Sequence, residues 1–135
     1  MQNYEILEHT GDVKIKAYGK SKEELFQNAM EGMFKILNPK SKGQNPKQRS
    51  IEIQSSDLNA LLVDFLSEVN YLRQTNMEMY NKVRFTKFSD MRLKGEIEGY
   101  EIEEFGEDIK AVTFHKLDIR QNKEGIWETS IIFDV

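Results

Sequence analysis

The first part of the chain combines strand-like alternation with one long amphipathic stretch. Tyr4–Glu8 predicts a short strand, and the period-two alternation of apolar and polar residues over 13–18 predicts a second one. A Ser-Lys-Glu-Glu capping box at 21–24 opens a helix, and a broad apolar face continues over Lys22–Leu37. Because a proline cannot continue the hydrogen-bond ladder, Pro39 predicts that the helix ends just before it.

A second helix and a run of strands follow. Asn38–Gln48 is predicted to be a polar loop, and Ile51 with Ile53 indicates a strand. Asp57, or Ser56 before it, caps a helix that is apolar over more than half of its circumference, so this helix should lie at the centre of the core. The strands predicted beyond it are Val83–Phe88, Met91–Tyr100, Ile109–Arg120 and Ile126–Val135.

The order of these elements favours an α+β fold. Helices do not alternate with every strand, which disfavours a doubly wound parallel sheet. A hairpin turn is predicted at 122–125, between the last two strands. We therefore expect two helices packed on a mainly antiparallel β-sheet, in a single domain that spans residues 1–135.

Composition limits the chemistry that this domain can perform. The chain has no cysteine, which excludes a disulfide scaffold, a thiolate zinc site and a cysteine nucleophile. No apolar run approaches the ~20 residues of a membrane helix, and the first residues lack a secretory pattern, so a cytoplasmic location is expected. The net charge of −4 disfavours a protein that binds nucleic acid on its own.

Charge is unevenly distributed along the chain. Residues 35–50 carry five basic residues and no acidic one, whereas residues 96–108 carry seven acidic residues and no basic one. These stretches are either a solvated loop and a solvated hairpin, or two opposite patches that orient a protein partner.

Carboxylates are the most informative polar groups, because the common phosphate-binding and zinc-binding motifs are absent from the sequence. Asp12 ends a tight turn and opens a strand. Asp64 interrupts an apolar helical run, so it lies on the narrow exposed edge of the helix or is buried with a partner. Asp134 has a second anionic group beside it if Val135 ends the native chain. Such oxygen ligands suit Ca²⁺, Mg²⁺ or Mn²⁺, and a terminal salt bridge is the alternative.

Several segments, in order and over nearly the whole chain, resemble the archease family. His-Thr-Gly-Asp at 9–12 is similar to the family's opening motif, and 57–72 resembles its central helix. Gly-Glu at 95–96, Ile-Lys-Ala-Val-Thr-Phe-His at 109–115 and Ile-Ile-Phe-Asp-Val at 131–135 resemble the rest of its pattern. Two departures are a phenylalanine at 114 where tyrosine is usual, and the lack of a histidine in the acidic stretch that follows residue 96.

The resemblance implies a protein cofactor rather than an enzyme. Archeases activate the RtcB-type tRNA-splicing RNA ligase by promoting its guanylylation from GTP and its multiple turnover. By family match, Asp12 and Asp134 are expected to bind a divalent metal ion through their side chains, and Val135 through a terminal or main-chain oxygen. Lys110 matches a lysine of the family's functional cluster. The weaker candidates are His9, Asp64 and Glu96.

Three other functions stay open at this point. One is a chaperone-like modulator of an RNA-modifying enzyme such as a tRNA methyltransferase, a role also attached to this family. Another is a small metal-dependent hydrolase built on Asp12 and Asp134. The third is a direct tRNA-binding module, which the net charge of −4 disfavours.

Overall fold

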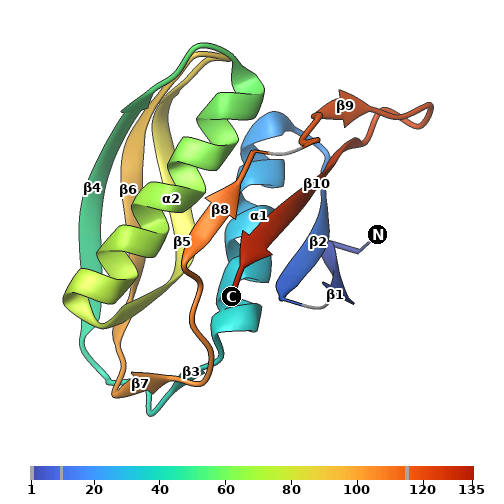
Figure 1. Ribbon diagram of the computed structural model, residues 1–135. Helices are drawn as coiled ribbons and strands as arrows, with labels where there is room; N and C mark the ends of the chain where they lie inside the picture. The colour runs from blue at the N-terminus through green and yellow to red at the C-terminus, as the bar shows by residue number, and fades with distance from the viewer. Residues whose placement is uncertain (1, 10, 115) are drawn as a thin grey trace.

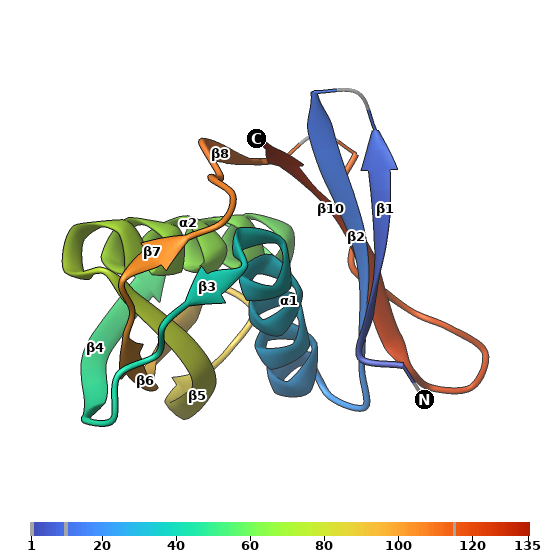
Figure 2. The same ribbon diagram turned by 90° about the horizontal axis from the view of Figure 1, so that it is seen from below.

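The computed structural model describes residues 2–9, 11–114 and 116–135, and it places two helices between two β-sheets (Figures 1 and 2). All described strand pairings are antiparallel, as the sequence predicts. The helices are α1 (Lys22–Leu37) and α2 (Leu58–Asn76).

The larger sheet has the order β1-β2-β10-β8, with β9 also paired to β10. Its strands are β1 (Tyr4–His9), β2 (Asp12–Gly19), β8 (Ala111–Thr113), β9 (Arg120–Gln121) and β10 (Trp127–Asp134). The second sheet has the order β4-β6-β5, with β4 (Pro46–Gln54), β5 (Glu78–Phe88) and β6 (Arg92–Glu101), and a small sheet pairs β3 (Pro39–Lys40) with β7 (Glu104–Phe105).

Helix α1 has the predicted boundaries. The hydroxyl of Ser21 accepts a hydrogen bond from the backbone N–H of Glu24 at 3.1 Å. The Glu24 carboxylate reaches back to the N–H of Lys20 at 3.1 Å, one residue earlier than in the expected capping box. Asn38 ends the helix in the left-handed region, with φ 52°, and Pro39 follows it. Local capping chemistry therefore fixes both ends of α1.

Helix α2 is the central helix of the core, as its wide apolar face predicts. Leu61, Leu62 and Phe65 have no exposed surface. The ring of Phe65 lies 5.5 Å from that of Phe26 on α1 and 5.9 Å from that of Phe85 on β5, between ring centroids. This aromatic cluster joins both helices to the three-stranded sheet. Neither helix is long and apolar enough to span a membrane, in the part of the chain that the structure describes.

The segment Asn38–Gln48 differs from the predicted polar loop. It contains β3 and the start of β4, and the N–H of Gly43 donates to the carbonyl oxygen of Glu101 at 2.7 Å. The ammonium of Lys47 lies 3.3 Å from the Glu101 carboxylate. Because β3 pairs with β7 and β4 pairs with β6, the basic and acidic stretches lie side by side and partly neutralise each other. They are therefore not two separate patches.

The single strand predicted over Ile109–Arg120 is wrong, because only β8 and β9 are extended there. Lys116 has φ 57°, which breaks the extended backbone. Leu117 then turns into the core, and the N–H of Ile119 donates to the side-chain oxygen of Asn59 at 2.9 Å. The apolar positions of this segment thus anchor an irregular crossing instead of a strand.

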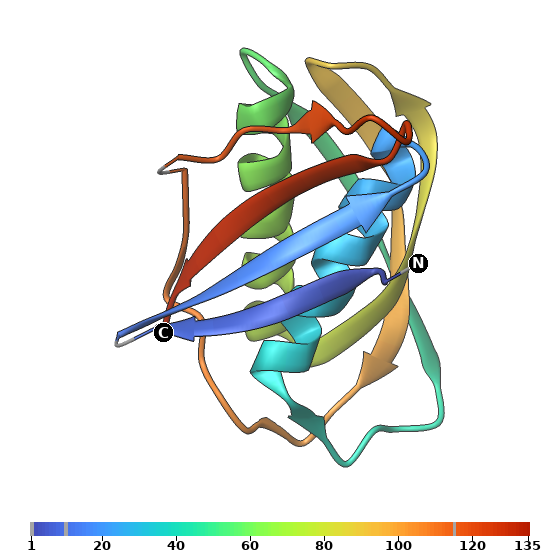
Figure 3. The same ribbon diagram turned by 90° about the vertical axis from the view of Figure 1, so that its right-hand side faces the viewer.

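The larger sheet has one covered and one open face. Ile15, Ala17, Ile131 and Phe133 point toward the helices and are fully buried. Figure 3 looks onto the opposite face, with β10, β2 and β1 in front and both helices behind them. Side chains on that face, such as Lys14, therefore alternate with the core residues and reach solvent.

Candidate functional site

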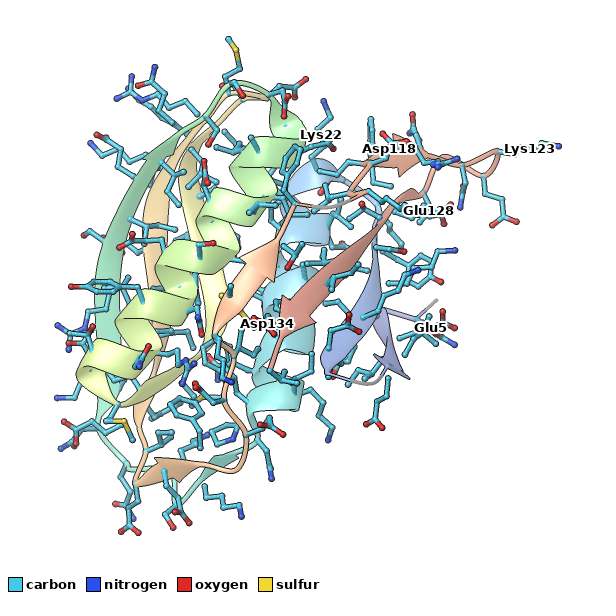
Figure 4. The ribbon with its side chains drawn as sticks, in the orientation of Figure 1. Glu5, Lys22, Asp118, Lys123, Glu128 and Asp134 are labelled. Carbon is cyan, nitrogen blue, oxygen red and sulfur yellow. The ribbon has the colours of Figure 1, made fainter. Side chains whose placement is uncertain are left out.

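Asp12 and Asp134 face each other on neighbouring strands. Asp12 opens β2, Asp134 closes β10, and the antiparallel register makes them direct partners. Side chains that are directly opposed in this way share one face of the sheet, with Cβ atoms about 4.5–5.5 Å apart. Figure 4 shows Asp134 where β10 ends. The fold therefore joins two carboxylates that lie near opposite ends of the sequence.

The electrostatics of this pair favour a bound cation. The Oδ1 atom of Asp12 is buried, and it accepts no hydrogen bond from the residues that the structure describes. A buried carboxylate oxygen without a partner is costly, and two like charges directly opposed in a sheet destabilise it. A hard divalent cation would relieve both effects, because carboxylate oxygens are the ligands that Ca²⁺, Mg²⁺ and Mn²⁺ prefer. The residues present therefore fit a divalent metal ion.

Lys110 lies beside the pair through its backbone. Its N–H donates to the main-chain oxygen of Asp134 at 2.7 Å, and the following residue, Ala111, is the register partner of Asp134 on β8. The side chain of Lys110 is exposed to solvent. Val135 is half-buried and packs against the core, which fixes the backbone next to Asp134.

A buried arginine lies behind this end of the sheet. Arg73 on α2 is 3% exposed, and its Nη2 atom donates to Asp108 Oδ1 at 2.9 Å and to the carbonyl oxygen of Ile109 at 3.2 Å. The hydrogen bond from Arg73 holds the pKa of the Asp108 carboxyl below its usual value. Our reading of the sequence overlooked this residue. Its signal is helical spacing, because Arg73 falls four positions after the buried Val69 on the apolar face.

The weaker candidates do not all join the site. Asp64 is exposed and accepts a hydrogen bond from the Ser55 hydroxyl at 2.6 Å, so it lies on the exposed edge of α2. Glu96 belongs to the three-stranded sheet, where it accepts from the side chain of Gln48. The backbone of His9 pairs with Asp12, while the side chain of His9 lies outside the described part of the structure.

The described residues contain no group of three or more histidine, cysteine, aspartate or glutamate side chains placed to hold a metal ion. The acidic side chains that the structure brings together at this point are the two carboxylates of Asp12 and Asp134. Main-chain oxygens lie close at hand, because Asp134 is the register partner of Asp12 and Val135 follows it directly.

Comparison with known proteins gives a consistent result. The model of the Archease protein family (MTH1598/TM1083) matches residues 4–135. The chain is 34% identical to the protein archease of Methanosarcina barkeri over 142 aligned residues, which cover 99% of this chain and 97% of that relative. It is 32% identical to the protein archease of Thermococcus gammatolerans, and that match covers all of both chains.

Solved structures show the same architecture. The solution structure of Methanobacterium thermoautotrophicum protein 1598 superposes with a TM-score of 0.80 at 32% identity, over the whole of both chains. The crystal structure of a Thermotoga maritima protein, described as an archease and possible chaperone, gives a TM-score of 0.70 at 18% identity. That second match covers 96% of this chain and 94% of the other.

Proposed function

The chain belongs to the archease family, and on this premise we propose that it activates an RtcB-type tRNA-splicing RNA ligase. In this role it promotes guanylylation of the ligase from GTP and sustains multiple turnover, without being an enzyme itself. The observation that carries the proposal is the direct pairing of Asp12 with Asp134, together with the unpartnered buried oxygen of Asp12. The proposed partner is the ligase, and the proposed cofactor is a divalent metal ion.

The residues of the site have distinct tasks in this proposal. Asp12 and Asp134 supply carboxylate oxygens for the cation, and Val135 supplies a main-chain or terminal oxygen. A bound divalent cation would neutralise charge on the phosphates during guanylate transfer. Lys110 offsets the charge of the carboxylates when the metal is absent, or contacts a phosphate as a point charge. All four groups lie at one end of the larger sheet, where a partner can reach them.

Substituting either carboxylate should separate binding from folding. We expect Asp12→Asn and Asp134→Asn to keep or slightly raise the melting temperature in chelator, because each removes one of two opposed like charges. Each should lower the affinity for Mn²⁺ or Ca²⁺ by at least about tenfold and reduce ligase stimulation correspondingly. Thermal melts with and without metal, and a multiple-turnover ligation assay, measure these effects.

Asp118→Asn is the matched control, because Asp118 is an exposed carboxylate that lies 3.5 Å from Arg120, away from the pair. It should leave metal affinity and ligase stimulation unchanged. The proposal would be contradicted if metal left the melting temperature of the wild type unchanged and if Asp12→Asn and Asp134→Asn both still stimulated the ligase. If Asp134 only forms a salt bridge, Asp134→Asn should instead lower stability in chelator.

A second candidate function has one observation in its favour, since the Thermotoga maritima protein is described as a possible chaperone. Under this alternative the chain improves the solubility or specificity of an RNA-modifying enzyme such as a tRNA methyltransferase. An assay of methyltransferase solubility and product pattern separates it from ligase activation. Turnover of phosphate esters by the isolated protein would instead indicate a metal-dependent hydrolase built on the two carboxylates.

A further inference from the structure

The peptide unit between Ile109 and Lys110 is held from both sides. Its carbonyl oxygen accepts a hydrogen bond from Asn70 Nδ2 at 3.0 Å and from Arg73 Nη2 at 3.2 Å. Its N–H donates to the main-chain oxygen of Asp134 at 2.7 Å. This single peptide therefore connects helix α2 to the end of β10, between the core and the candidate site.

The two donors on α2 are themselves firmly placed. Asn70 is 8% exposed and Arg73 is 3% exposed. The Nε atom of Arg73 donates to Asn70 Oδ1 at 2.8 Å, and its guanidinium lies 4.8 Å from the ring centroid of Phe105. Contacts other than those to the peptide therefore fix the orientation of both donors. Such supporting contacts are needed to hold a functional site in an accurate geometry.

Burial of the Arg73 guanidinium would be unfavourable if this side chain served only to fill space in the core. Burying an arginine costs free energy that an ion pair with a partly exposed carboxylate such as Asp108 recovers only in part. An apolar side chain of similar volume would fill the same space without that cost. The charged side chain instead contributes a hydrogen bond to the Ile109 carbonyl. This bond is strengthened because linked hydrogen bonds polarise one another.

We propose that Asn70 and Arg73 are positioning residues that set the place of Lys110 relative to Asp12 and Asp134. They act through the Ile109–Lys110 peptide and touch neither carboxylate. The inference rests on the proposed function, since it assigns these residues to the working site. Loosening them should release Lys110 and weaken stimulation of the ligase while the two sheets stay folded.

Arg73→Met removes the donors and keeps the apolar stem, and Asn70→Leu does the same for the second donor. Amide hydrogen exchange followed by NMR should show the Lys110 N–H exchanging at least about tenfold faster in either variant. The N–H of Ile131, inside the larger sheet, should keep its protection. An equal acceleration at both amides, or none at Lys110, would overturn the proposal.

A double-mutant cycle tests whether Arg73 acts through Lys110. We expect Arg73→Met and Lys110→Ala to reduce ligase stimulation to a similar degree, and the double variant to lose no more than Lys110→Ala alone. A double variant whose two losses multiply, or a Lys110→Ala variant that stimulates like the wild type, would contradict the inference. Arg73→Lys should recover little of the stimulation lost in Arg73→Met, because lysine has a single nitrogen and cannot replace both Nε, which donates to Asn70, and Nη2, which donates to Asp108 and Ile109.

Val83→Ala is the stability control. Val83 is 8% exposed in the three-stranded sheet, so its truncation should destabilise the protein without removing a contact to the Ile109–Lys110 peptide. It should leave stimulation unchanged wherever it remains folded. The two proposals also fail differently. A wild-type protein that stimulates no ligase contradicts the proposed function, and the exchange of the Lys110 amide still decides whether Asn70 and Arg73 position that residue.

Discussion

Replacing Arg49 with methionine should destabilise the protein by about 2–4 kcal/mol near pH 7. Glu78 is 1% exposed, and its two carboxylate oxygens accept from Arg49 Nε at 2.9 Å and from Nη2 at 2.7 Å. The hydroxyl of Tyr80 donates to the same carboxylate at 2.8 Å. Without the arginine a buried negative charge keeps one neutral donor. The expected loss lies below that of a fully buried pair because the Arg49 side chain is 40% exposed.

The loss should shrink in acid. The hydrogen bond from Arg49 holds the pKa of the Glu78 carboxyl below its usual value. A carboxyl with a depressed pKa contributes stability that is present above its unfolded pKa and disappears as the pH falls through the folded one. The wild type therefore loses this contribution below about pH 5, and the variant has little of it to lose. Urea unfolding of both proteins across that range measures the difference.

Arg92→Met is the matched control for this prediction. Arg92 lies 3.5 Å from Glu52, and both side chains are about half exposed, so the pair should contribute less than about 1 kcal/mol. Equal losses in the two variants would show that Arg49 stabilises the sheet through its stem rather than through Glu78. A loss in Arg49→Met that is independent of pH would lead to the same conclusion.

Phe65→Ala should cost about 3–5 kcal/mol of unfolding free energy. The ring of Phe65 is fully buried and packs between Phe26 and Phe85, so truncation leaves a cavity where both helices meet the three-stranded sheet. Chemical denaturation gives the value directly. Tyr71→Ala on the same helix should change stability by less than about 0.5 kcal/mol, since Tyr71 is 60% exposed. A small effect at Phe65 would mean that α2 can shift to fill the space.

Sequence patterns predicted both helices and most of the long strands because their signals are local, although β5 begins at Glu78, before the predicted start at Val83. Ser21 and Asp57 both accept from the first turn of their helices, at 3.1 Å and 2.8 Å. Asp12 and Asp134 could each be identified as strand-end carboxylates, and the resemblance to a family linked them. Their register pairing itself is a property of the fold, since no local pattern encodes a contact between distant strands.

Other features lay beyond local patterns. The alternation over Ile109–Arg120 is that of a strand, yet a left-handed residue at Lys116 and the burial of Leu117 break it. The pairing of the basic and acidic stretches depends on which strands become neighbours. Arg73 could have been found from its helical spacing, but its partners at Asp108 and Ile109 are contacts that only the folded chain creates.

The position of β10 has a consequence for how the molecule is made. Strand β10 is the last described strand, and it lies between β2 and β8 in the interior of the larger sheet. The hairpin of β1 and β2 therefore leaves the ribosome long before β10, its neighbour in the sheet, has been synthesised. Until then β2 presents an unpaired backbone edge on the side that later pairs with β10. Asp12 meets Asp134 only when this late, long-range pairing is complete. The carboxylate pair therefore forms only after β10 has been made and paired, and a copy that lacks β10 cannot present it to a partner.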